Sequence, residues 1–186
     1  MAVAKALTFK GEAMANPFEL FGLPVQFQVD AALLSERYLA LQKSLHPDNF
    51  SASSAQEQRM AVQKSAEIND ALHTLKDPIK RAEAIIEAHT GEMHDIEQKS
   101  NRDMAFLMQQ MEWREALEEI ENNQDESALF DFSQEIAQAQ KAILAQLETT
   151  LNAQQWQDAL AINDKLRFIK KLMVEIERVE ETVFDF

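Results

Sequence analysis

Glycine and proline are scarce in this chain, with three glycines and four prolines among 186 residues. These two residues interrupt helices most strongly, so their scarcity leaves few places where a helix must end. Alanine, leucine, glutamate, glutamine, lysine and methionine, which favour helix, dominate the remainder. The sequence therefore predicts an all-α protein, in which the few breaks mark the ends of helices.

The charge of the chain is unevenly distributed. Residues 1–90 carry 9 basic and 11 acidic side chains, a net charge of −2, whereas residues 91–186 carry 9 and 21, a net charge of −12. Binding to a phosphate backbone needs clustered lysine and arginine, so the total of −14 argues against a nucleic-acid partner. The two halves present different electrostatic surfaces, which predicts different partners.

Cysteine and long apolar runs are both absent from the sequence. Without cysteine there is no disulfide, no thiolate metal site and no cysteine nucleophile, which fits a reducing compartment. No stretch reaches the roughly 18 apolar residues that a membrane helix requires, and Lys5 interrupts an opening that is too short for a signal peptide. We expect a soluble, cytoplasmic protein with no membrane contact and no cofactor.

Two antiparallel helices are predicted in the first half. Asp30 can cap a helix over residues 31–45. Pro47 ends that helix, because proline has no amide hydrogen and disfavours α conformation at the residue before it. Ser54 and Glu57 form an S-x-x-E capping box that opens the next helix.

The rest of the chain predicts a short connecting helix and then a bundle. Asp77 and Pro78 begin the short helix, and Gly91 ends it. Three longer helices follow, and the short breaks between them imply antiparallel neighbours, at about 101–121, 127–151 and 155–182.

Met14 looks like a natural start, so we set the residues before it aside as an upstream extension or a cloning remnant. The predicted organisation is this extension, a first domain that includes the connecting helix, and a bundle domain, at residues 1–13, 14–89 and 90–186.

His46, Pro47 and Asp48 occupy the turn between the first two predicted helices. His46 lies at the end of a helix and Asp48 in the connection, where both side chains can face outward. The rigid ring of Pro47 limits their relative freedom. Such a tripeptide also arises by chance in roughly one such chain in a hundred. Two interpretations stay open here: a polar turn of accidental composition, or a contact tripeptide displayed for a partner.

The helix predicted at 101–121 has two apolar lines, of which one bundle core needs only one. The first line consists of Phe106, Trp113, Leu117 and Ile120. The second consists of Met104, Leu107, Met108 and Met111, and it continues into Glu112, Glu115, Glu118 and Glu119. The second line could pack against another part of the chain, but a buried surface would not tolerate unpaired carboxylates. An adaptable apolar patch with an acidic border, suited to a basic and partly apolar partner, fits better.

The last predicted helix carries a single apolar seam that should face the bundle core. Its members step by four and three residues, and they are Ile162, Leu166, Ile169, Met173 and Ile176. Phe168 and Leu172 lie off that seam.

Residues 16–78 resemble a J-domain. The resemblance rests on the opening "NPFELFGL", a helix with basic residues, the His-Pro-Asp turn and "AEINDALHTLKDP" in the following helix. It implies that the turn and the helix before it bind a DnaK-type chaperone in its ATP state, where Asp48 pairs with a partner arginine and triggers ATP hydrolysis. Asn49 stands where J-domains often have lysine or arginine, so the turn itself carries more of the recognition. The implied chaperone-binding residues are Arg37, Lys43, His46, Pro47 and Asp48.

Residues 16–186 as a whole are similar to the HscB family of J-type co-chaperones. The segments "FELFGLP", "HPDNF", "DMAFLMQQMEWREALEEI", "KLRFIKKL" and the terminal "FDF" carry this resemblance. It implies a J-domain helical hairpin followed by a three-helix bundle, which binds an iron–sulfur cluster scaffold protein and presents it to an HscA-type chaperone. The implied scaffold-binding residues are Leu107, Met108, Met111, Glu112, Glu115, Glu118, Glu119, Arg167 and Phe168.

Enzymatic and metal-binding interpretations find little support in the sequence. Glycines are too few for a phosphate-binding loop, and no G-x-S-x-G occurs. A di-iron bundle needs repeated E-x-x-H, and the nearest pattern is the single D-x-x-H of Asp70 and His73. His89 and His94 flank Gly91, but their spacing is weak evidence for a metal. We expect neither catalysis nor a bound metal; the remaining alternative is a structural helical adaptor in which the tripeptide is incidental.

Overall fold

The computed structural model describes residues 16–91 and 103–184, and these contain α-helices, one short 3-10 helix and no strand. The predicted all-α class is confirmed. The extension predicted at 1–13, His94 and the last two residues of the terminal "FDF" lie outside the described residues. Within the described residues, no helix combines the length and the apolar character needed to cross a membrane.

The chain divides into two compact units, and each is described by itself. The first unit comprises Asp30–Leu75 with the residues up to Val25, and the second comprises Gln26–Val29 with the chain from Lys76 onward. The helices of the first unit are α1 (Pro17–Leu20), α2 (Ala31–Ser44), the 3-10 helix η1 (Pro47–Phe50) and α3 (Ala55–Lys76). Those of the second are α4 (Pro78–Thr90), α5 (Met104–Asn123), α6 (Glu126–Asn152) and α7 (Trp156–Phe184). The predicted helix bounds lie within one turn of these.

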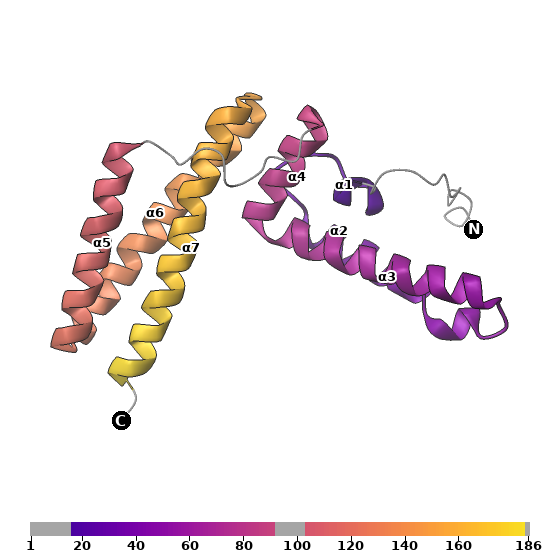
Figure 1. Cartoon of the computed structure of the whole chain (residues 1–186), viewed down its shortest axis with the longest axis horizontal. Helices are drawn as coiled ribbons and strands as arrows, with labels where there is room; N and C mark the ends of the chain where they lie inside the picture. Colours follow the sequence, from indigo (N-terminus) through magenta and orange to yellow (C-terminus); the bar gives the residue numbers. More distant parts are fainter. Residues whose placement is uncertain (1–15, 92–102, 185–186) are drawn as a thin grey trace. The chain divides into compact units, whose positions relative to one another are not determined.

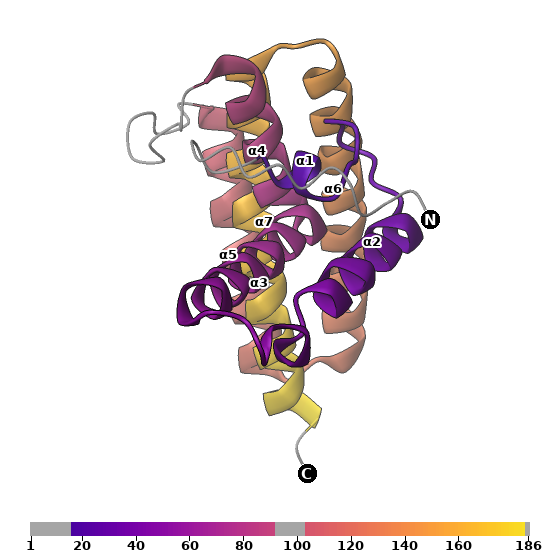
Figure 2. The same ribbon diagram turned by 90° about the vertical axis from the view of Figure 1, so that its right-hand side faces the viewer.

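In the first unit, α2 and α3 form the predicted antiparallel hairpin and lie side by side (Figures 1 and 2). Polar side chains fix their register: Tyr38 Oη donates a hydrogen bond to Asn69 Oδ1 at 3.1 Å, and Gln42 Nε2 donates to the same oxygen at 2.8 Å. Ser65 Oγ donates to Gln42 Oε1 at 3.2 Å. The large side chains buried in this unit are Phe18, Phe21, Leu23, Leu34, Ile68, Leu72 and Leu75.

The helices begin where the predicted capping residues stand. Asp30 Oδ1 accepts hydrogen bonds from the backbone N–H groups of Ala32 and Leu33, at 2.9 and 3.0 Å. Glu57 Oε2 accepts from the backbone N–H and the hydroxyl of Ser54, both at 2.8 Å, which is the predicted capping box. These bonds hold the pKa of Glu57 below its usual value.

In the second unit, α5, α6 and α7 form an antiparallel three-helix bundle (Figure 1). Its core contains Trp113, Leu117, Leu129, Phe132, Ile136, Ile169, Leu172, Ile176 and Val179. One detail of the predicted seam of α7 is wrong. Leu172, expected outside the seam, is buried, whereas Met173 packs only partly against the core. Because α7 packs against α4, α5 and α6, its buried face is wide enough for a residue beside the predicted line.

The short helix α4 packs against α6 and α7. Its N-cap Asp77 pairs through Oδ2 with Lys170 Nζ of α7 at 2.6 Å. The fully buried Asn163 of α7 donates from Nδ2 to the backbone oxygen of Ile79 at 3.2 Å. Gly91 ends α4 in the left-handed conformation, with φ of 69°. The helix predicted as a connector is therefore built into the packing of the bundle.

Candidate partner-binding sites

The His-Pro-Asp tripeptide lies in the turn between α2 and α3, where Pro47 begins the 3-10 helix η1. Proline suits this first position because its fixed φ matches the helix and its missing N–H has no partner to lose there. The side chains of His46 and Asp48 are 60% and 89% exposed. The structure therefore presents the two polar side chains of the predicted contact tripeptide to solvent.

The exposed ring of His46 also forms a hydrogen bond within the turn. Its Nδ1 accepts a hydrogen bond from the backbone N–H of Asp48 at 3.3 Å, so His46 caps η1. The same nitrogen lies 3.4 Å from Asp48 Oδ2. One nitrogen cannot accept from the amide and donate to the carboxylate together, so the neutral ring caps the turn and a protonated ring would pair with Asp48. In the neutral form the ring proton lies on Nε2, which leaves the Asp48 carboxylate without that pairing.

Asn49 closes the end of α2. Its Nδ2 donates hydrogen bonds to the backbone oxygens of Lys43 at 2.9 Å and Ser44 at 3.3 Å, two carbonyls of the last helical turn. Gln58 of α3 donates from Nε2 to the backbone oxygens of Phe50 at 3.1 Å and Ser53 at 3.2 Å. Sequence reasoning treated Asn49 only as a missing positive charge and did not select Gln58. Together they hold the turn in place from both sides.

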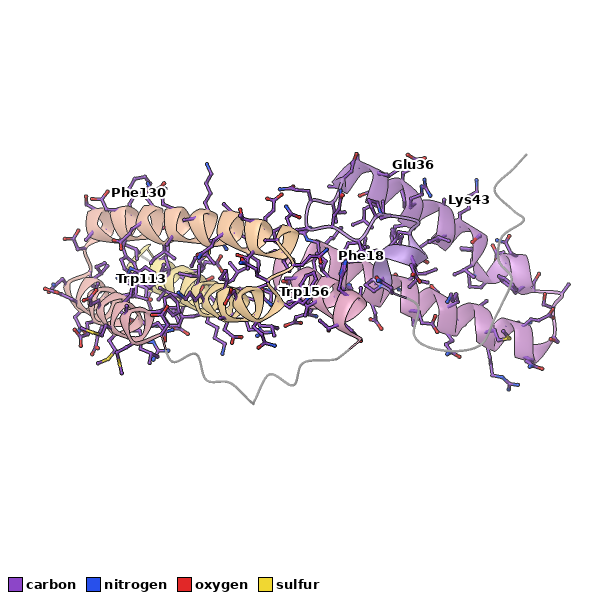
Figure 3. The ribbon with its side chains drawn as sticks, turned by 90° about the horizontal axis from the view of Figure 1, so that it is seen from above. Phe18, Glu36, Lys43, Trp113, Phe130 and Trp156 are labelled. Atoms are coloured by element: carbon purple, nitrogen blue, oxygen red, sulfur yellow. The ribbon has the colours of Figure 1, made fainter. Side chains whose placement is uncertain are left out.

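Arg37 and Lys43, the predicted basic contacts, are exposed on α2. Figure 3 shows the side chain of Lys43 pointing outward from α2, on the same helix as the outward-pointing Glu36. Arg37 lies against the turn at Gly22: a Cβ added there would be 3.2 Å from Arg37 Nη1. Gly22 also has φ of 60°, a conformation that suits glycine. Arg37 thus lies close to this turn as well as being exposed to solvent.

The second apolar line of α5 is exposed, as predicted. Met104, Leu107, Met108 and Met111 are 69%, 43%, 58% and 62% exposed. The four glutamates that continue the line, Glu112, Glu115, Glu118 and Glu119, are also exposed. We call these eight residues the α5 face. It joins a band of flexible apolar side chains to a band of carboxylates along one side of a single helix.

Aromatic packing holds the opposite side of α5 in the bundle. Trp113 stacks on Phe168 of α7 with ring centroids 6.2 Å apart, and Phe106 meets Phe168 edge to face at 5.8 Å. The indole nitrogen of Trp113 donates to Glu135 Oε1 of α6 at 2.8 Å. Figure 3 marks Trp113 in this bundle. Because these contacts fix the buried side, the α5 face points to solvent.

Ion pairs fasten both ends of α5 to α7. Asp103, the N-cap, accepts through Oδ2 from Lys165 Nζ at 2.6 Å, and this bond holds the pKa of Asp103 below its usual value. Near the other end, Arg178 donates to both carboxylate oxygens of Glu121, at 2.9 and 3.0 Å. A bidentate pair of this kind also fixes orientation. The helix that carries the α5 face is therefore held at both ends and in the middle.

Arg167 and Phe168, the remaining predicted scaffold contacts, lie on α7. Arg167 pairs with Glu83 of α4 and, at 2.6 Å, with Asp164. Burial lowers the pKa of Arg167. Phe168 is half-buried between Phe106 and Trp113, and the Arg114 guanidinium lies 5.4 Å from its ring centroid. Phe168 therefore packs against two aromatic rings of α5, whereas Arg167 forms its ion pairs with Glu83 of α4 and with Asp164 of α7 itself.

Among the described residues, no group of three or more histidine, aspartate or glutamate side chains is arranged to hold a metal ion. His89, one of the two histidines considered in the sequence, has its Nδ1 2.8 Å from the backbone oxygen of Ile85. Its ring stacks on Trp156 with centroids 4.9 Å apart. His89 is thus engaged in packing at the end of α4.

A J-type hairpin with a displayed His-Pro-Asp turn, followed by a three-helix bundle, defines a co-chaperone of the J-domain class. Residues 102–177 match the family described as the HSCB C-terminal oligomerisation domain. The co-chaperone protein HscB homologue of Pasteurella multocida is 65% identical over 171 residues, covering 92% of this chain and 99% of that protein. The chain therefore belongs to the HscB family of co-chaperones.

Solved structures of the family agree with the fold. The chaperone HscB from Vibrio cholerae is 46% identical, with a TM-score of 0.80 over 91% of this chain and 99% of that one. The crystal structure of human co-chaperone protein HscB is 27% identical, with a TM-score of 0.82 over 91% of this chain and 84% of that one. These similarities confirm the predicted family and the predicted architecture of a helical hairpin followed by a bundle.

Proposed function

We propose that this chain binds an iron–sulfur cluster scaffold protein through the α5 face, delivers it to an HscA-type, DnaK-like chaperone, and stimulates that chaperone's ATPase through the His46-Pro47-Asp48 turn. The chain itself hydrolyses nothing in this scheme. The observation that carries the proposal is the coexistence of two exposed sites of unlike chemistry on two separate units: a polar turn and an apolar, acidic helix face.

The turn suits a brief, polar contact with the ATPase. Asp48 presents an exposed carboxylate that can accept a bidentate hydrogen bond from an arginine of the chaperone. The bonds made by His46 and Asn49 fix the backbone around it, so little conformational entropy is lost when the contact forms. Lys43 adds positive charge beside the turn, which favours approach to an acidic surface.

The α5 face suits a longer-lived contact with the scaffold protein. Three methionines and Leu107 supply adaptable apolar area, and the neighbouring carboxylates favour a basic partner. Phe168 of α7 packs against Phe106 and Trp113 on the buried side of α5, so in the proposal it supports the α5 face. Arg167 stays a prediction, because its ion pairs lead to Glu83 and Asp164.

Single-turnover ATP hydrolysis by the HscA-type chaperone tests the role of the turn. The intact chain should accelerate hydrolysis, and Asp48→Asn should reduce that acceleration by more than about tenfold. The reason is that Asn cannot supply the charge of the pair that Asp48 would form with the chaperone arginine, and losing one partner of a pair that the complex buries costs about 2–5 kcal/mol. Asp70→Asn removes the same charge from α3 of the same unit and should behave like the unchanged chain. If the intact chain does not accelerate hydrolysis, or if Asp48→Asn accelerates it equally, the chain is the structural adaptor considered above.

Calorimetric titration with the scaffold protein tests the α5 face. Leu107→Ala and Met108→Ala should each weaken binding by about 1–2 kcal/mol if these side chains are anchors. Phe130→Ala is the matched control, because Phe130 is 65% exposed but lies on α6, and its side chain points away from the bundle (Figure 3). Binding that Leu107→Ala leaves unchanged, or that Phe130→Ala weakens equally, would contradict the assignment. Circular dichroism of each variant separates lost contacts from lost helix.

A further inference from the structure

The α5 face contains three methionines whose side chains are accessible to solvent. Met104, Met108 and Met111 follow one another at spacings of four and three residues, which places their thioethers on one side of the helix. They are more than half exposed, at 69%, 58% and 62%. Met173 of α7 differs, because it packs partly against the bundle core. Among the described residues of the second unit, the accessible sulfur atoms are thus concentrated on the surface that is proposed to bind the scaffold.

An exposed thioether reacts with hydrogen peroxide. The sulfur lone pair attacks one peroxide oxygen, the O–O bond breaks, and the sulfur retains that oxygen as a sulfoxide. The hydroxyl bound to sulfur gives its proton to the leaving hydroxide, which becomes water, so the sulfur loses two electrons and the peroxide gains them. Thiol-dependent methionine sulfoxide reductases reverse the change.

Oxidation would change the chemistry of the α5 face without touching its supports. A sulfoxide is a polar hydrogen-bond acceptor, and it would lie beside carboxylates that are also acceptors, such as Glu112 and Glu115. Three of the four members of the apolar band would become polar, Leu107 would stay apolar, and the face would keep its negative charge. The side chains that hold α5 in the bundle, Trp113 and Leu117, contain no sulfur and are buried. The fold should therefore survive the change that removes the binding surface.

We infer that Met104, Met108 and Met111 form a reversible oxidation site, at which peroxide switches off binding of the scaffold protein. This inference rests on the proposed function of the α5 face. The turn at His46-Pro47-Asp48 contains no oxidisable sulfur, so stimulation of the chaperone ATPase by the chain alone should persist. Under peroxide the chain would release its client yet keep its chaperone contact.

The test compares the full chain with two variants before and after treatment with hydrogen peroxide. Peptide mass spectrometry should show Met104, Met108 and Met111 oxidised before Met173. The dissociation constant for the scaffold protein should then rise by about tenfold or more, because polar oxygens replace the apolar contacts of a binding face. A methionine sulfoxide reductase system should restore it.

The first variant replaces all three methionines of the α5 face by leucine, which is similar in volume and favours helix. Because these replacements alter the binding face itself, the dissociation constant of the untreated variant serves as its own reference, and that constant should change by less than about twofold after treatment. The second variant, Met60→Leu with Met173→Leu, should lose binding on oxidation as the unchanged chain does. An oxidised chain that binds undiminished, or a triple-leucine variant that loses binding equally, would overturn the inference. Failure of the untreated chain to bind the scaffold protein would instead overturn the proposed function.

Discussion

The turn at His46-Pro47-Asp48 depends on backbone geometry, whereas the α5 face depends on which residues fall on one side of a regular helix. In the turn, three hydrogen bonds made by His46 and Asn49 place a single carboxylate. On α5, no local bond positions the exposed methionines, and the helix itself is held by side chains on its other side. The turn should therefore be sensitive to local changes nearby, and the α5 face to changes in distant packing.

The largest expected effect comes from removing the main support of α5. Trp113→Ala should lower the free energy of unfolding by about 3–5 kcal/mol, because a buried aromatic leaves a cavity and Glu135 loses a hydrogen-bond donor. Denaturant unfolding followed by circular dichroism measures the loss. Scaffold binding should fall with it, while acceleration of the chaperone ATPase should be retained. Equal loss of both activities would mean that the two sites are not supported separately.

A smaller effect is expected from removing the support of the turn at Asn49. Asn49→Ala removes both hydrogen bonds to the last carbonyls of α2 and should cost about 1–2 kcal/mol of stability. Single-turnover ATP hydrolysis should show a several-fold weaker stimulation, with scaffold binding unchanged. Asn152→Ala, at the exposed end of α6, serves as the control. Stimulation that survives Asn49→Ala intact would show that the turn does not need this support.

A pH titration examines the packing of α4 on the bundle. Burial alone would raise the pKa of Asp77, but the hydrogen bonds from Lys170 and from the backbone N–H of Ile79 outweigh it, so the pKa lies below the usual 3.8. The carboxylate therefore stabilises the fold above pH about 4 and loses that contribution as the pH falls through its lowered pKa. Lys170→Gln should flatten the acid limb of the stability profile, by less than about 1 kcal/mol because Lys170 is largely exposed. An identical acid limb in the two proteins would contradict this.

The smallest expected effect concerns the end of α5. Gln124 has φ of 51°, a left-handed conformation that glycine adopts at lower cost. Gln124→Gly should therefore raise the free energy of unfolding by about 0.5 kcal/mol. The same replacement inside a helix, Gln138→Gly on α6, should lower it by about 0.5–1 kcal/mol. Thermal unfolding of the two variants measures both changes. Changes of the same sign in the free energy of unfolding would contradict the prediction.

Much of the fold could be predicted because its determinants are local. Asp30, Ser54 and Asp77 each satisfy backbone groups within three residues, so the sequence contains the whole interaction. The exposed line of α5 could also be predicted, since helical periodicity separates Met108 from Trp113 without reference to any neighbour.

Other features required the three-dimensional arrangement. Leu172 and Met173 are adjacent, and which one enters the core depends on how the neighbouring helices pack against α7. The bonds of Asn49 to the carbonyls of α2 depend on the path of the turn. Arg167 was assigned to the scaffold by resemblance, but its ion pair with Glu83 arises from the packing of α4. Contacts between residues close in the sequence can therefore be predicted from sequence patterns, whereas contacts between helices depend on tertiary packing.

The stacking of His89 on Trp156 gives the protein a built-in optical signal. The chain has two tryptophans, one in the aromatic support of α5 and one against an imidazole at the end of α4. Because the His89 ring covers one face of the indole, emission from Trp156 should change when this stacking is lost. Figure 3 marks Trp156 apart from Trp113. Single replacement of either tryptophan by phenylalanine would let emission report loosening of α5 and loosening of the end of α4 as separate events, without any added label.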